Sequence, residues 1–184
     1  MLVNLDWETL CARLQQHSGL DDVRAEIVNG PIVMSAMLGY LKPGAYHQAL
    51  CEKLASRLPY KEFVDIWNGL LSANEDMTAL VEWLKPIHRL VLGSNTDPIH
   101  FAYSVQQFPV LGNFESFFLS YEMGLVKPDA VFFHHILDSL DVQATDCVFV
   151  DDRAENVESA RKIGITAIQF EDAHQFQLYL KGIL

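Results

Sequence analysis

The stretch VFVDDRAENV, positions 148–157, decides the fold of this 184-residue chain. Three apolar residues are followed directly by two adjacent carboxylates, Asp151 and Asp152, and then by a polar segment with helix character. A short, continuously apolar run of this kind is typical of a strand that is covered on both faces in a parallel sheet. Sheets of that class bind ligands beyond the carboxyl ends of their strands. The polar residues that directly follow each strand are therefore the first candidates for a functional site.

The residues before and after this stretch repeat the same pattern. Strands alternating with helices predict an α/β fold built on a Rossmann-like parallel sheet. From about Trp7 to about Leu84, apolar residues instead recur at helix spacing, which predicts a helical cap inserted near the N-terminus. We therefore expect a cap at residues 7–84 and an α/β core formed by residues 1–6 and 85–184. Expected strands lie at 90–92, 117–119, 148–150 and 165–170, and expected helices at 99–107, 129–140 and 156–163.

Composition and charge restrict the class of protein and its partners. Half of the residues are hydrophobic and 20% are charged, which is a globular composition. The formal net charge of -11 disfavours nucleic acid and membrane surfaces as partners. Three cysteines at wide spacing and the lack of a leader-like start predict a cytoplasmic protein without a disulfide framework. A small phosphorylated metabolite remains a suitable partner if a metal ion and a lysine reverse the sign of the charge locally.

The paired acids have two interpretations. Asp151 and Asp152 at a strand end suit a hard cation such as Mg²⁺, which prefers oxygen ligands. Asp152 with Glu155 three residues later is also a capping pattern, in which Asp152 would be the N-cap of the next helix. Both interpretations stay open, because one face of a carboxylate can cap a helix while the other binds a metal.

The other strand ends carry weaker signals. Ser94 and Asn95 follow the strand expected at 90–92 and offer a hydroxyl and backbone N–H groups for a phosphate. Asp97, close behind them, predicts an ordinary N-cap. Lys127 precedes a proline at the start of an expected helix, where it could pair with phosphate oxygens or with neighbouring carboxylates. Taken alone, a lysine at such a position is usually solvated.

In chain order, these clusters resemble the motifs of one family. LGSNT at 92–96 resembles its second motif, GLVKPD at 124–129 its third, and VFVDDRAENV at 148–157 its fourth. Together with FLS at 118–120, they resemble the haloacid dehalogenase-like (HAD-like) hydrolase superfamily, in particular its capped phosphatases of sugar phosphates and nucleotides. The resemblance extends from about residue 7 to the end of the chain, and its specificity lies in the later half.

The resemblance implies a magnesium-dependent phosphatase of a small phosphate ester that acts through an aspartyl-phosphate. Phosphoryl transfer needs positioning and charge neutralisation more than proton chemistry, which agrees with the residue types present. The implied roles are metal binding by Asp152 directly and by Asp151 directly or through water, phosphate binding by Ser94, Asn95 and Lys127, and support of the acids by Asn156. Lys127 would also neutralise charge on the nucleophile and on the transferring phosphoryl group.

The sequence departs from the family at its first motif, an apolar strand that ends in the nucleophilic aspartate. LVNLDW at 2–7 resembles only the exit from that motif, so the strand and the nucleophile are expected before Met1. Asp6 is a poor substitute, because the stub of apolar residues before it is too short for a strand that spans a sheet. In this fold the first strand is central. Without it, two interior strands would keep unpaired N–H and C=O groups, and a homo-oligomer is one way to cover them.

Three hypotheses follow from the sequence. The first is an active phosphatase whose first strand lies upstream of Met1. The second is a catalytically inactive HAD-like protein that binds a phosphorylated ligand or a protein partner. The third, a signalling receiver domain, is disfavoured because the order of serine, lysine and acid pair differs from the order in receivers. Whether the chain is an enzyme is open at this point, as is the substrate, for which sugar phosphates, nucleotides and flavin phosphate are candidates.

Overall fold

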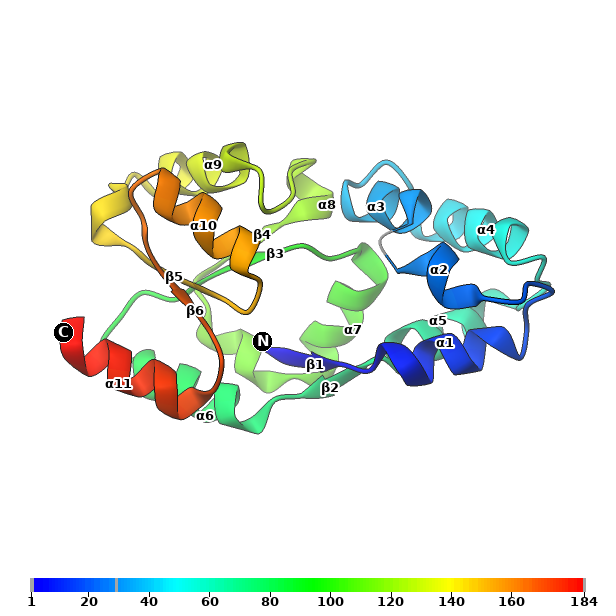
Figure 1. Cartoon of the computed structure of the whole chain (residues 1–184), viewed down its shortest axis with the longest axis horizontal. Helices are drawn as coiled ribbons and strands as arrows, with labels where there is room; N and C mark the ends of the chain where they lie inside the picture. Colours follow the sequence, from blue (N-terminus) through cyan, green and yellow to red (C-terminus); the bar gives the residue numbers. More distant parts are fainter. Residues whose placement is uncertain (1, 29, 184) are drawn as a thin grey trace.

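The computed structural model describes residues 2–28 and 30–183, and Figure 1 shows a helical cap at one end and an α/β core at the other. The cap contains α1 (Trp7–Gln15), α2 (Val23–Ile27), α3 (Pro31–Met37), α4 (Pro43–Lys53) and α5 (Tyr60–Asn68). A short antiparallel pair, β1 (Val3–Leu5) and β2 (Leu71–Ala73), carries the chain into and out of the cap. The core contains α6 (Glu75–Leu84), β3 (Val91–Ser94), α7 (Pro98–Gln107), η1 (Pro109–Asn113), β4 (Ser116–Leu119), α8 (Ser120–Met123), α9 (Ala130–Leu140), η2 (Ala144–Asp146), β5 (Val148–Asp151), α10 (Ala154–Lys162), β6 (Thr166–Gln169) and α11 (Ala173–Ile183).

The predicted α/β fold with a helical cap is confirmed. Each expected strand is present to within two residues, and α7, α9 and α10 occupy the expected helical stretches. The helix α9 begins at Ala130 with Asp129 as its N-cap, so Pro128 precedes the helix instead of opening it. None of the described helices is long and apolar enough to cross a lipid bilayer.

The cap has a continuous hydrophobic core of its own. One cluster of fifteen buried residues includes Tyr46, Phe63 and Trp67, and most of its members lie on α1 to α5, with Ile99 added from α7 of the core. The stripe at helix spacing along α5 produces this arrangement, because Phe63 and Trp67 stack with ring centroids 5.7 Å apart on the inner face. The predicted cap limits, 7–84, stay a prediction. Within that range, α6 packs through Met77 and Leu80 in a different cluster, which includes Phe176 of α11.

The core sheet is divided into two parallel pairs. β3 pairs with β4, and β5 pairs with β6, but among the described residues no ladder joins β3 to β5. The C=O of Leu90 accepts a hydrogen bond from the N–H of Glu115, next to β4. The C=O of Asp151 accepts one from the N–H of Phe170, next to β6. Because backbone groups alternate sides along a strand, those of Gly93 and Val150 point toward the open edges. The prediction that two interior strands lack partners on one side is thus confirmed for the described residues.

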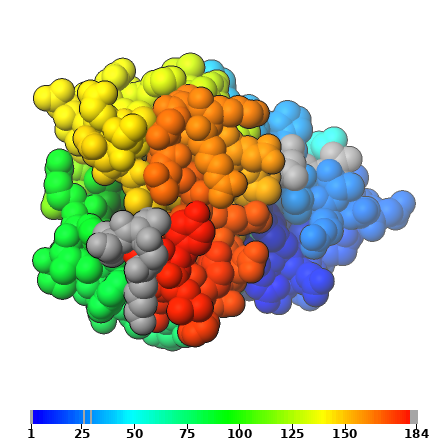
Figure 2. Space-filling model, turned by 60° about the vertical axis from the view of Figure 1, so that its left-hand side comes forward, coloured from blue at the N-terminus to red at the C-terminus, as the bar shows by residue number. Residues whose placement is uncertain are grey.

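The two pairs nevertheless form one layer. In Figure 1, α9 and α10 lie on one side of the strands, and α6 and α11 lie on the other. The helix α9 contacts both strand pairs. Its Phe132 ring packs close to Gly93 of β3, where an added Cβ would lie 3.2 Å from the ring. Its Phe133 ring lies 5.0 Å, between centroids, from the ring of Phe149 in β5. Figure 2 shows α10 (orange) and α11 (red) covering the β5–β6 end of the core, with the cap (blue) beyond them. Helices therefore bridge the two strand pairs, between which the described part of the chain forms no ladder.

Candidate functional site

The carboxyl ends of β3 and β5 meet through Lys127. Ser94 ends β3 and Asp151 ends β5. Asn95, the residue after Ser94, holds the Lys127 backbone with two hydrogen bonds of 2.9 Å, one donated by the Asn95 amide to the Lys127 carbonyl and one donated by the Lys127 N–H. The ammonium of Lys127 then reaches across to Asp151 Oδ2 at 2.6 Å. Side chains that are far apart in sequence thus join the two halves of the sheet at one rim.

Asp151 accepts hydrogen bonds at both of its carboxylate oxygens. Its Oδ1 accepts from the backbone N–H of Arg153 at 3.0 Å and from the amide of Asn156 at 2.9 Å. Burial by itself would raise the pKa of Asp151, but the charge and hydrogen bond of Lys127, helped by Arg153 N–H and Asn156, hold it below the ordinary value. Asp151 therefore stays ionised and serves here as the buried counter-ion of Lys127.

Asp152 lies at the surface of the same rim. Its predicted role as N-cap of α10 is wrong, because the N-cap is Arg153 and no side chain caps that helix. The reason is that Asp151 already accepts the Arg153 N–H, while Glu155 pairs with the Arg153 guanidinium at 2.6 Å instead of reaching back to the helix start. The Asp152 carboxylate is not used in capping the helix and is exposed at the carboxyl end of β5.

A second buried network is centred on Asp97, three residues after Ser94 in the chain. The sequence predicted only the capping role of Asp97. Asp97 caps α7, as predicted, through Oδ1, which accepts from the N–H groups of Ile99 and His100. Its Oδ2 also accepts from the indole N–H of Trp67 at 3.1 Å and lies 3.0 Å from His100 Nδ1. The His100 ring stacks on Trp67, with centroids 5.1 Å apart. The spacing of Asp97 and His100, three residues apart at a helix start, is a sequence signal for their contact. The partner of Asp97 in the cap, Trp67, could not be read from the sequence.

The hydroxyl of Ser120 holds the loop between β3 and α7 at Thr96. Ser120 is fully buried, and its Oγ accepts from the Thr96 N–H and donates to the Thr96 carbonyl, both at 3.0 Å. With Asp97 and Asn95, it clamps the loop after β3 in one conformation. Ser94 is thereby presented at the end of its strand by a loop that is held from three directions.

Asp6 does not belong to this rim. It is the N-cap of α1, and its Oδ1 accepts from the Thr9 N–H at 2.9 Å. The strand before it, β1, pairs antiparallel with β2 and not with β3 or β5. The alternative in which a stub strand ending in Asp6 enters the sheet is therefore wrong.

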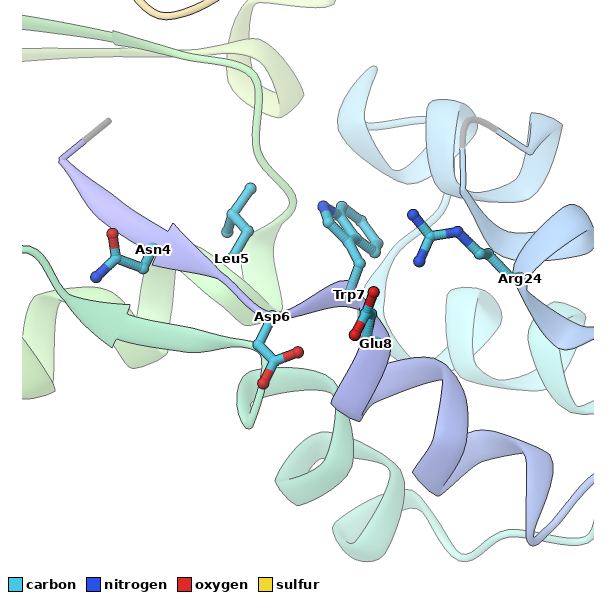
Figure 3. Close-up of a pocket in the computed structure, with 6 residues that line it drawn as sticks. All are labelled: Asn4, Leu5, Asp6, Trp7, Glu8 and Arg24. Carbon is cyan, nitrogen blue, oxygen red and sulfur yellow. The ribbon is translucent and has the colours of Figure 1, made fainter. Parts of the chain in front are cut away.

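A pocket of about 400 Å³ lies where the chain passes from β1 into the cap. Figure 3 shows the Trp7 ring and the Arg24 guanidinium pointing toward one another, with the Glu8 carboxylate beside them and Asp6 turned away. The remaining lining residues are Asn4 and Leu5.

Comparisons with known proteins bear on the family and the fold of this chain. The family model of haloacid dehalogenase-like hydrolases matches residues 22–164. A HAD family enzyme of Bacteroides thetaiotaomicron, solved with magnesium and inorganic phosphate, is 25% identical with a TM-score of 0.85, and the match covers 95% of this chain and 93% of that chain.

Two curated relatives are phosphatases. The D-ribitol-5-phosphate phosphatase of Bacteroides thetaiotaomicron is 23% identical over 154 residues, which are 79% of this chain and 74% of that protein. A sesquiterpene phosphatase of Aspergillus oryzae is 37% identical over 60 residues, 33% of this chain and 31% of that protein. The chain spans between 13 and 31% of the length of the first curated relatives it matches. The family model covers well over half of the sequence, and this chain belongs to the haloacid dehalogenase-like hydrolases.

Proposed function

We propose that this protein is a magnesium-dependent phosphatase of small phosphate esters that works through an aspartyl-phosphate when an apolar strand ending in an aspartate lies between β3 and β5. The observation that carries the proposal is the Asn95–Lys127–Asp151 bridge, which brings a cation and acidic oxygens to the rim where Ser94 ends its strand. Phosphatases among the relatives of this chain support the same reaction class.

In this proposal each side chain at the rim has one task. The Ser94 hydroxyl and the Asn95 backbone N–H bind phosphoryl oxygens. Lys127 keeps its ammonium close to the phosphoryl group and to the attacking carboxylate, because Asn95 fixes its backbone and Asp151 orients its side chain. Asn156 orients Asp151 through the 2.9 Å hydrogen bond. Positioned charge of this kind lowers the barrier to phosphoryl transfer.

The donors at the rim fit Mg²⁺. Asp152 offers an exposed carboxylate, and Asp151 is the second acid of the pair. The described residues contain no group of three metal-ligating side chains. That donor set suits Mg²⁺, which is commonly held by one or two carboxylates with waters and substrate phosphate. Bound there, Mg²⁺ would supply charge neutralisation for the phosphate oxygens.

The experiment supplies the strand. We would compare the 184-residue chain with a version extended at its N-terminus by an apolar strand of about six residues that ends in Asp, assaying p-nitrophenyl phosphate with Mg²⁺. Turnover is expected only in the extended protein, and Lys127→Met or Asp152→Asn in that protein should abolish most of it.

A matched extension that ends in Asn is the control. It adds the same strand without a nucleophile, so it should raise the melting temperature as much as the Asp version but give no turnover. Equal turnover with Asp and Asn at that position would refute the aspartyl-phosphate route.

A further inference from the structure

One ring nitrogen of His100 contacts the core and the other contacts the cap. His100 lies in the first turn of α7, and α5 of the cap packs against that helix (Figure 1). Its Nδ1 is 3.0 Å from Asp97 Oδ2, and its Nε2 is 3.0 Å from the backbone carbonyl oxygen of Trp67, near the end of α5. His100 is only 9% exposed, and its ring stacks on the Trp67 indole with 7° between the planes. Each ring nitrogen therefore faces an oxygen in a site that is nearly closed to water.

Both of these oxygens are hydrogen-bond acceptors. The Trp67 carbonyl has no hydrogen to donate. Burial alone would raise the pKa of the Asp97 carboxyl, but His100 and the Trp67 indole N–H hold it below its ordinary value, so Asp97 is ionised. A neutral imidazole has one N–H and one bare nitrogen, and it can donate to only one of the two oxygens. An imidazolium has two N–H groups and can donate to both, so the contacts match the protonated ring.

The described titratable neighbours of this pair change charge at much higher pH. Asp97 acts electrostatically on two further titratable side chains, Tyr46 of α4 and Tyr121 of α8. Burial raises the pKa of Tyr46 well above its ordinary value and, helped by Glu122, raises that of Tyr121 to about 12. Trp67, on α5, has no group that titrates. Between about pH 5 and pH 8, where imidazoles change charge, the proton count of this described cluster is therefore set by His100.

We propose that His100 is a positioning residue that fastens the cap to the core fully only when its imidazole is protonated. One N–H group then donates to the Asp97 carboxylate and the other to the Trp67 carbonyl. When the ring loses a proton to solvent, it keeps the N–H that faces the charged carboxylate, because that hydrogen bond is the stronger one. The bond to the Trp67 carbonyl is lost, and α5 keeps the indole bond to Asp97 as its polar link to the start of α7.

The proposal concerns the joint between cap and core and does not depend on the proposed phosphatase activity. Asp97 also caps α7 through the N–H groups of Ile99 and His100, so the proton on His100 affects the same carboxylate that fixes the start of that helix. A higher pH should therefore loosen the cap while α7 keeps its N-cap.

The first test observes the ring directly. The ¹⁵N-labelled chain would be studied by NMR at about pH 5 and about pH 8.5, on either side of the range in which imidazoles titrate. The His100 signals are those that are absent from both His100→Gln and His100→Phe. Both ring nitrogens should carry a hydrogen at the lower pH, and Nε2 should have lost its hydrogen at the higher pH. A bare ring nitrogen at the lower pH, or two N–H groups at both pH values, would overturn the proposal.

The second test measures how the joint depends on pH. The parent and His100→Gln would be unfolded in urea at the same two pH values. From the lower to the higher pH, the ratio of folded to unfolded parent should fall about tenfold more than that of His100→Gln, the loss expected for one buried hydrogen bond. The sign follows because the folded parent holds the proton that makes this bond, so its stabilisation is present at low pH and is lost as pH rises.

Two further variants complete the comparison. His100→Phe keeps a ring against the Trp67 indole without the nitrogens, and it should show the same weak pH dependence as His100→Gln. His134→Gln, at an exposed histidine of α9, is the matched control and should follow the parent. An equal pH dependence in the parent and in both His100 variants would contradict the proposal.

Discussion

The cap and the core are held together by different kinds of interaction. The cap has one uninterrupted cluster, in which Tyr46, Trp67 and Ile27 are at most 1% exposed. The core distributes its buried residues over three smaller clusters around two separate strand pairs. Its halves are joined at the site by side chains, since Asn95 holds Lys127 and Lys127 holds Asp151. The cap is stabilised by burial of apolar surface, whereas the site depends on a few polar contacts of high individual weight.

The largest effect is expected from removing the cation that joins the core halves. Lys127→Met leaves Asp151 buried without its counter-ion, and breaking a buried pair in this way costs about 3 to 5 kcal/mol. The side chains of Lys127 and Asp151 are only 10% and 6% exposed. Urea unfolding would measure the loss, with Lys85→Met, at an exposed lysine that bonds Asn113, as the control. Equal losses in both variants would mean that the bridge is not what joins the halves.

The next effect concerns the carboxylate that both regions share. Asp97→Asn keeps the shape but places an amide against the Trp67 indole and the His100 ring, and we expect a loss of about 2 to 3 kcal/mol. Asp129→Asn is the matched control, because Asp129 caps α9 at the surface and asparagine caps equally well. If the two variants unfold at the same urea concentration, cap and core are not coupled through Asp97.

A smaller effect should come from the contact between cap and core at Gly39. Its φ of +74° disfavours a side chain, and a Cβ there would run into the Tyr121 carbonyl. Gly39→Ala should therefore lower the free energy of unfolding by about 2 kcal/mol. Gly44→Ala, within α4 and with open space around the added methyl, should be neutral or slightly stabilising. A neutral Gly39→Ala would show that the cap does not rest on α8.

The smallest effect is a difference in acid sensitivity. The pKa of Asp151 is lowered in the folded protein, so its stabilisation is complete above the unfolded value of 3.8 and is lost as pH falls below it. In Lys127→Met, burial still raises the pKa of Asp151, but the charge of Lys127 no longer lowers it. The free energy of unfolding should therefore depend less steeply on pH. Unfolding free energies of both proteins between about pH 5 and pH 2.5 would test the sign. A steeper dependence in Lys127→Met would contradict it.

The α/β core and its site-bearing strand ends could be predicted, because continuous apolar runs and the polar residues after them are local features. The α7 cap at Asp97 was readable for the same reason. The capping role given to Asp152 was wrong, because Asp151 already accepts the Arg153 N–H and is held in that position by Asn156 and Lys127, and Lys127 is distant in sequence. The link from Asp97 to Trp67 joins residues thirty positions apart, so no local pattern could reveal it. The assignments of Ser94 and Asp152 to phosphate and metal stay predictions.

Asp97 contacts both the cap and the core, and this has a consequence for how the cap can move. One carboxylate accepts hydrogens from the Trp67 indole, at the end of the last cap helix, and from the first turn of α7, which is continuous with the loop bearing Ser94. A cap that swings away must either break the indole bond or drag the start of α7 with it. In the proposed phosphatase, admission of a substrate and adjustment of the loop after Ser94 would then be one coupled movement, and the link between them is a single side chain without access to solvent.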